Sequence, residues 1–60
     1  MNYKLTTRFF DSGKVGVSAV TETSEPVGQT RKQGNACDEY TDICATRAEA
    51  VELRNQALNA

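Results

Sequence analysis

Two segments near the start of the chain alternate apolar and polar residues with a period of two. Residues 2–10 and 14–22 are also rich in Val, Thr, Tyr and Phe, which is the composition of strands. Asp11-Ser12-Gly13 lies between them and is a turn signal, because glycine adopts a positive φ without strain. The pattern predicts an antiparallel hairpin closed by a three-residue turn, with Gly13 in the left-handed position.

The length of this turn decides which side chains share a face of the hairpin. A two-residue turn scatters the apolar residues over both faces, whereas a three-residue turn gathers them on one. The pairs predicted for that face are Phe9–Val15, Thr7–Val17, Leu5–Ala19 and Tyr3–Thr21. Phe9 is then expected in the core, and Phe10 on the solvated face beside Arg8 and Lys14.

The period-two pattern stops after this hairpin. Residues 23–36 contain one proline, two glycines and many polar residues, a composition that predicts a long connecting loop. A loop of this length is either mobile or functional. Its one basic pair is Arg31 and Lys32, so we expect either a solvated loop or a contact loop there.

Residues 37–45 fit two structures. Apolar residues recur there at helical spacing, so one long helix from about residue 37 is an alternative. The Thr, Asp and Ile residues of the segment are weak helix formers, and they favour a third strand. Tyr40 and Cys44 lie on one face of that strand, and Thr41 and Ile43 on the other. The pattern leaves open which of these faces meets the core.

Residues 47–59 predict a helix, since Ala, Glu, Leu, Arg and Gln dominate them. Thr46 and Glu49 have the spacing of a capping box at its start. Its apolar residues fall into two groups, with Arg47 and Arg54 between them: Ala50, Leu53 and Ala57, and then Ala48, Val51 and Leu58. Either both groups form one wide apolar face crossed by the arginine stems, or the second group serves another subunit or a partner.

Together these elements predict a single α+β domain over residues 1–60, with the order strand, strand, loop, strand, helix. The C-terminal helix is expected to pack on one face of the antiparallel sheet. A 60-residue chain buries only about 60% of its unfolded surface, so its stability is marginal. A homodimer and a marginally stable monomer are both compatible with that size.

The charge balance and the cysteines limit the cellular setting. Seven basic and eight acidic residues give a net charge of −1, which argues against a nucleic-acid partner. We expect a cytoplasmic protein with no membrane span, because no signal segment and no long apolar run is present. Cys37 and Cys44 lie too far apart on a strand or helix for an internal disulfide, so both are expected as reduced thiols.

The sequence offers little for catalysis. It contains no histidine, so Ser–His and Cys–His pairs are excluded, and two thiols alone are too few to hold zinc. Asp38, Glu39 and Asp42 form an acidic cluster that could bind a divalent cation. We interpret it instead as charge that protects an edge strand from association. No enzyme activity, metal or other cofactor is therefore expected.

Two functional hypotheses remain. The first is a small protein that binds another protein, because interface energy concentrates on exposed aromatic and arginine side chains. The predicted partner-binding residues are Phe10, Arg8, Lys14, Tyr40, Val51, Arg54 and Leu58. In size, mild acidity and layout the chain resembles accessory proteins of phages and prophages, some of which bind and inhibit host proteins. The alternative is a nucleic-acid-binding module that uses the outer hairpin face and the Arg31-Lys32 loop.

Overall fold

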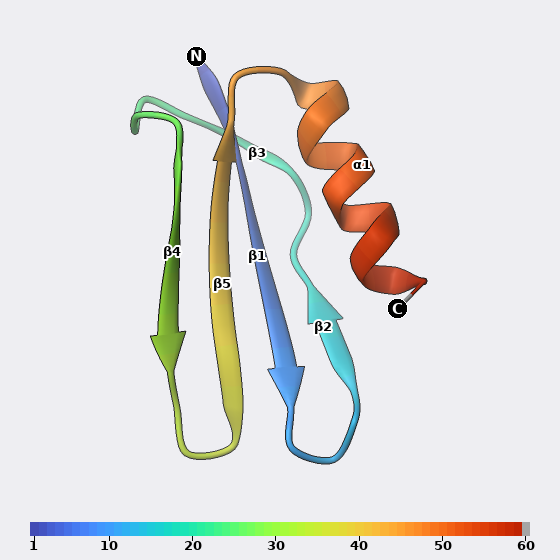
Figure 1. Ribbon diagram of the computed structural model, residues 1–60. Coiled ribbons are helices and arrows are strands. Elements are labelled where there is room, and N and C mark those ends of the chain that lie inside the picture. The colour runs from blue at the N-terminus through green and yellow to red at the C-terminus, as the bar shows by residue number, and fades with distance from the viewer. Residues whose placement is uncertain (60) are drawn as a thin grey trace.

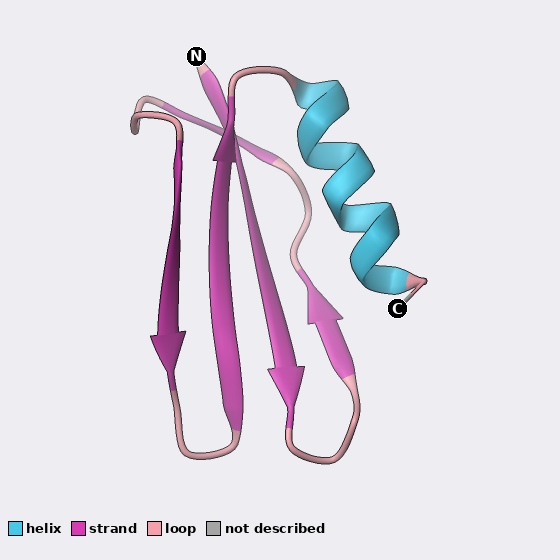
Figure 2. Ribbon diagram, viewed as in Figure 1, coloured by secondary structure: helices cyan, strands magenta, loops and turns pink. Residues whose placement is uncertain are grey.

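The computed structural model describes residues 1–59 and consists of one antiparallel sheet with a helix on one of its faces (Figures 1 and 2). The elements are β1 (Asn2–Phe10), β2 (Val15–Val17), β3 (Thr21–Thr23), β4 (Gly28–Gln33), β5 (Cys37–Cys44) and α1 (Arg47–Leu58). The strand order is β2–β1–β5–β4, and β3 also pairs with β1. The predicted α+β class and the C-terminal helix on the sheet are confirmed.

The turn between β1 and β2 has the predicted length. The N–H of Gly13 donates to the carbonyl of Phe10, and the N–H of Phe10 donates to the carbonyl of Lys14, both at 2.9 Å. Gly13 has a φ of +91°, as a left-handed turn position requires. The pairs Phe9–Val15 and Thr7–Val17 follow from this turn and are confirmed.

The second half of the predicted hairpin is different. Residues 14–22 form two short strands, because the register shifts by one residue between β2 and β3. Tyr3 consequently lies opposite Glu22, so the predicted pair Tyr3–Thr21 is wrong. The predicted pair Leu5–Ala19 falls between β2 and β3 and is not among the pairs of either strand with β1. One extra residue on the edge strand is a β-bulge.

Ser18 explains how the chain tolerates this shift. Its N–H donates to the carbonyl of Thr6 at 2.9 Å, as in a regular ladder. The N–H of Thr6 donates to the Ser18 hydroxyl, also at 2.9 Å, instead of to the Ser18 carbonyl. That carbonyl accepts from Arg54 Nε of α1 at 3.1 Å. A side-chain hydroxyl thus replaces the missing backbone acceptor, and the helix takes up the displaced carbonyl.

The predicted loop over residues 23–36 is wrong, because β4 occupies its middle. β4 pairs with β5 in a second hairpin, and Arg31 and Lys32 lie on this edge strand rather than in a loop. All six residues of β4 are exposed, so the strand carries no apolar alternation for a sequence pattern to detect. β3 pairs with the start of β1, and a short connection leads from β3 into β4 at this end of the sheet (Figure 1).

Glu25 holds this connection in place. Its backbone carbonyl accepts from Asn2 Nδ2 at 2.8 Å, and its carboxylate forms a 2.9 Å ion pair with Lys4. The Thr23 hydroxyl donates to the same carboxylate at 2.9 Å. These contacts hold the pKa of Glu25 below its usual value, chiefly through the Lys4 and Thr23 hydrogen bonds.

The strand predicted over residues 37–45 is confirmed as β5, which excludes a long helix. β5 lies between β1 and β4 and pairs with both. The acidic cluster therefore lies on an inner strand, and its interpretation as edge protection is wrong. Instead, each carboxylate contacts a donor on a flanking strand: Glu39 contacts Arg8, Asp38 contacts Arg31, and Asp42 contacts Gln29.

α1 begins with the predicted cap, since the Thr46 hydroxyl accepts from the N–H of Glu49 at 3.2 Å. It ends at Leu58, one residue before the predicted end. The helix covers the sheet face that carries Leu5 and Cys44, and Leu5 and Ala50 are fully buried there. This answers which face of β5 meets the core: the one with Tyr40 and Cys44.

The helix covers only part of this face. α1 packs against β1, β2 and β5, and within residues 1–59 it does not reach β4. The outermost strands of a four-strand row lie about 14 Å apart, whereas a helix is about 10 Å wide. The part of the face over β5 and β4 therefore remains open.

Candidate binding groove

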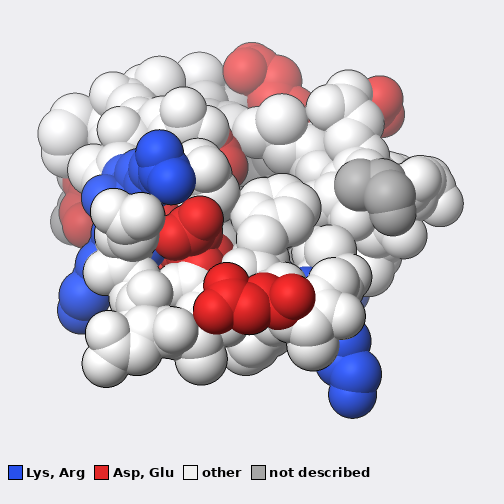
Figure 3. Space-filling model, turned by 60° about the horizontal axis from the view of Figure 1, so that its bottom comes forward, with Lys and Arg blue, Asp and Glu red and all other residues white. Residues whose placement is uncertain are grey.

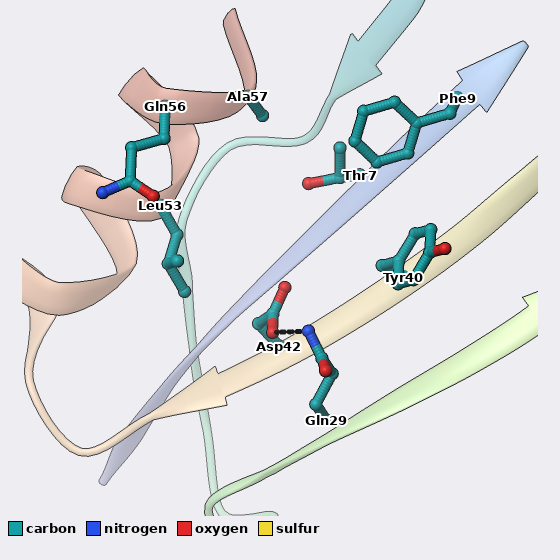
Figure 4. A pocket seen from close by; sticks show the side chains of 8 residues that line it. All are labelled: Thr7, Phe9, Gln29, Tyr40, Asp42, Leu53, Gln56 and Ala57. Atoms are coloured by element: carbon teal, nitrogen blue, oxygen red, sulfur yellow. Dashed lines mark hydrogen bonds between the residues drawn. The ribbon is translucent and has the colours of Figure 1, made fainter. Parts of the chain in front are cut away.

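An open groove lies between α1 and the uncovered part of the sheet (Figure 4). Its volume is about 290 Å³, which is close to the lower end for small-ligand sites. We call it the α1–β5 groove. It is lined by residues of β1, β5, β4 and α1: Thr7, Phe9, Tyr40, Asp42, Gln29, Leu53, Gln56 and Ala57.

Phe9 and Tyr40 form the aromatic wall of the groove. Their ring centroids are 5.5 Å apart and their planes are inclined by 84°, an edge-to-face pair. Phe9 was expected in the core, but 39% of it is exposed. It points to the predicted face, and the C-terminal end of α1 stops short of the β1–β2 turn beside it (Figure 1). The helix is too short to cover this ring.

Two carboxylates flank Tyr40 on the same face of β5. Asp38 lies two residues before Tyr40 and accepts from Arg31 Nη2 at 3.4 Å, while the Arg31 guanidinium carbon is 5.6 Å from the centroid of the Tyr40 ring. Asp42 lies two residues after Tyr40, and its Oδ1 accepts from Gln29 Nε2 at 2.7 Å (Figure 4). Asp42 Oδ2 makes no hydrogen bond within residues 1–59.

The helix supplies the opposite wall. Gln56 and Ala57 lie three and four residues after Leu53, so all three share one side of α1. Leu53 and Ala57 provide aliphatic surface, and both are partly buried. Gln56 Nε2 donates to Glu52 Oε1 at 3.3 Å, so this amide nitrogen is engaged within its own helix. The groove thus combines an aromatic wall, an aliphatic wall and the Asp42 carboxylate.

Of the seven predicted partner-binding residues, only Tyr40 lines this groove. Phe10, Arg8 and Lys14 lie at the turn end of the opposite sheet face, as expected from the register. The Phe10 ring covers Gly16, since a Cβ there would lie 3.4 Å from Phe10 Cε2. Phe10 is 38% exposed, nearly the same as Phe9.

The other three predicted residues lie on α1, outside the groove. Val51 and Leu58 are exposed, whereas Ala50 of the first apolar group is buried against the sheet. The division into two groups is therefore confirmed. Arg54 is partly buried and binds the Ser18 carbonyl. The predicted residues thus occupy three separate places instead of one surface.

The sequence prediction missed Phe9, Asp42 and Leu53 as parts of an open site. Their positions on the helix-covered face follow from the alternation and the helical spacing. The opening over Asp42 follows from the width of a sheet that includes β4, which the prediction did not contain, and Phe9 is exposed because α1 ends short of it.

Acidic and basic side chains lie next to one another on the surface. Lys4 pairs with Glu25 and Arg8 pairs with Glu39, each at 2.9 Å, and Arg31 lies 3.4 Å from Asp38. Figure 3 shows basic and acidic surfaces interspersed, with no large area of either charge on that side. This arrangement gives no support to the nucleic-acid hypothesis, which relies on a continuous basic surface.

Both cysteines are free thiols, on opposite faces and at opposite ends of β5. Burial raises the pKa of the Cys44 thiol, and the nearby Glu49 and Asp42 carboxylates add to this rise. Residues 1–59 contain no group of three potential metal ligands. In the same range, no helix has the length and apolar character that crossing a membrane requires.

Comparisons with known proteins give no relative: no family model, no curated protein and no solved structure matches the chain.

Proposed function

We propose that this chain is a small non-catalytic protein that binds another protein through the α1–β5 groove. The observation that carries the proposal is the Phe9–Tyr40 pair in an open groove, with Phe9 exposed and Tyr40 partly buried. Aromatic side chains that line concave, partly apolar surfaces are common anchor points in interfaces.

The energy available at this wall is substantial for so small a chain. An aromatic side chain has a surface of about 200 Å², so the 39% exposed fraction of Phe9 leaves about 80 Å² to bury. At about 25 cal/mol/Å², a partner that covers it gains about 2 kcal/mol from this ring alone. The surroundings of the ring, Leu53 and Ala57, add aliphatic contact.

We further propose that the chain is cytoplasmic and modulates a host protein, as some accessory proteins of phages and prophages do. The two free thiols support a reducing compartment. The small buried core supports stabilisation by a partner, because Leu5, Cys44 and Ala50 are the buried apolar residues. A second copy of the chain is one such partner, and sedimentation equilibrium at micromolar concentration tests it directly.

The two neighbouring phenylalanines offer a matched test. Phe9 and Phe10 are equally exposed but lie on opposite faces of β1. The tagged chain, its Phe9→Ala variant and its Phe10→Ala variant are used to capture proteins from a bacterial lysate, with quantitative mass spectrometry as the readout. We expect a specific partner that Phe9→Ala loses and Phe10→Ala retains.

Unfolding in urea controls for stability. Because about 60% of each residue, or about 120 Å², is covered, both substitutions are expected to cost about 2–3 kcal/mol, so unequal capture reports binding. Loss of the partner with Phe10→Ala alone places the interface on the opposite face, with Phe10, Arg8 and Lys14, and refutes the groove. Retention with both variants refutes binding through either ring.

A further inference from the structure

The α1–β5 groove has a defined chemical character on its sheet side. Asp42 is partly buried, and Gln29 binds only its Oδ1. The second oxygen of this carboxylate remains without a partner within residues 1–59, next to the aromatic wall. A carboxylate beside aromatic faces and aliphatic walls matches a cationic group on an aliphatic stem, which is an arginine or lysine side chain.

The chain itself contains the same arrangement once already. On the other side of Tyr40, the Arg31 guanidinium lies over the ring and contacts Asp38. Asp38 and Asp42 are placed symmetrically about Tyr40 on β5, two residues before and two residues after it. Arg31 fills the Asp38 side, whereas the groove is the open space on the Asp42 side.

The charges around the groove point to the same class of ligand. Asp42 is the one charged residue among those that line it. Arg31, which lies opposite Tyr40 on β4, is paired with Asp38. An acidic or neutral segment gains nothing from the Asp42 carboxylate, whereas a cation gains a charge-assisted hydrogen bond from it.

We propose that the α1–β5 groove binds a lysine or arginine side chain of a basic segment on the partner protein. This inference rests on the proposed function and specifies the partner's chemistry. The cation contacts Asp42 Oδ2 and the Tyr40 and Phe9 rings, while its stem lies along Leu53 and Ala57.

A second copy of the chain is a poorer source of this cation. Its arginines are engaged within their own fold: Arg8 and Arg31 by carboxylates, Arg47 by the Tyr3 ring, and Arg54 by the Ser18 carbonyl. Lys4 is paired with Glu25. Only Lys14 and Lys32 remain without such a contact in the described part of the chain. Lys14 lies at the β1–β2 turn, and Lys32 lies on the sheet face opposite the groove.

Peptide titrations followed in ¹⁵N–¹H NMR spectra test the site. The probes are three blocked alanine pentapeptides whose central residue is arginine, norleucine or glutamate. We expect the arginine peptide to bind with a dissociation constant in the range of about 1–10 mM and to shift the amides of Tyr40, Asp42 and Leu53. The norleucine peptide should bind at least about fivefold more weakly, since it lacks the charge that Asp42 recognises.

Substitution of the carboxylate gives the matched control. Asp42→Asn keeps the size of the side chain and the acceptor for Gln29, and it should weaken arginine-peptide binding by about fivefold. Asp11→Asn makes the same charge change at the exposed β1–β2 turn and should alter binding by less than about twofold. If Asp42→Asn unfolds, the comparison of arginine and norleucine peptides on the unsubstituted chain still decides.

Three results overturn the cation site: equal binding of the arginine and norleucine peptides, equal effects of Asp42→Asn and Asp11→Asn, or no groove shift with the arginine peptide at about 20 mM. These results do not refute the proposed function if Phe9→Ala still abolishes partner capture. Conversely, arginine binding in the groove without any captured partner supports the site and refutes its use by a lysate protein. If the protein dimerises without any peptide and the amide signals of Tyr40, Asp42 and Leu53 are lost, a second copy occupies the groove and the proposal is refuted.

Discussion

Replacement of Ser18 by alanine tests how the fold accommodates its one-residue register shift. The Ser18 hydroxyl is the acceptor for the N–H of Thr6, at a place where a regular ladder uses a backbone carbonyl. The Ser18 carbonyl is turned toward the helix and bound by Arg54. Ser18→Ala therefore removes the hydroxyl and leaves the Thr6 donor without its partner.

The size of the effect follows from the burial of this donor. A typical hydrogen bond contributes about 0.5–1.5 kcal/mol net, and a fully buried unpaired donor costs about 1–3 kcal/mol. The bond to Thr6 is partly buried, so water replaces some of the lost interaction. We expect the free energy of unfolding to fall by about 1–2 kcal/mol. Domains of this length have a total of about 3–9 kcal/mol, so the loss is a large share.

Two measurements check this expectation. Urea unfolding monitored by circular dichroism gives the change in the free energy of unfolding, with Ser24→Ala at an exposed position as the control. Hydrogen exchange reports the Thr6 amide itself, which should exchange about tenfold faster for each 1.4 kcal/mol of lost local protection.

One alternative rearrangement makes the reasoning refutable. If the Ser18 carbonyl leaves Arg54 and returns to the Thr6 amide, the regular ladder forms and the hydroxyl is dispensable. A loss below about 0.5 kcal/mol with an unchanged Thr6 exchange rate would show this and contradict the assigned role.

Three further predictions concern single sites. Gly13→Ala should lower the free energy of unfolding by about 1–2 kcal/mol in urea titrations, because alanine is strained at a φ of +91°. Iodoacetamide at pH 8 should alkylate Cys37 before Cys44, as followed by mass spectrometry, since burial lowers the access of Cys44 and raises its pKa. Lys4→Met should raise the pKa of Glu25 toward its ordinary value in an NMR titration. Because the folded-state pKa of Glu25 is lowered, its stabilising contribution is complete above the unfolded-state pKa and is lost as the pH falls through the folded-state pKa.

Each of these predictions has a contradicting result. Unchanged stability of Gly13→Ala would mean that the turn adopts another type. Faster alkylation of Cys44 would mean that the helix opens away from β5 often enough to expose this thiol. An unchanged Glu25 pKa in Lys4→Met would assign its lowering to the Thr23 hydroxyl, and Thr23→Val tests that assignment.

Features that depend on near neighbours along the chain could be predicted from the sequence. Gly13 and its turn fixed the register of Phe9 with Val15, because one left-handed residue sets the loop length. Thr46 and Glu49 marked the start of the helix, since a cap acts within one turn. The helical spacing of the apolar residues put Ala50 and Val51 in different groups, and these groups are the buried side and the exposed side of the helix.

Features that depend on partners far away in the sequence could not be predicted from local patterns. β4 is polar and exposed along its whole length, so its strand conformation comes from backbone pairing with β5 rather than from a hydrophobic pattern. The register shift at Ser18 depends on Arg54, which lies 36 residues later in the chain. The opening of the α1–β5 groove depends on the width of a sheet that includes β4, and the exposure of Phe9 depends on where the helix ends. Alternation tells which face a side chain points to, but whether anything covers that face is decided by elements far away in the sequence.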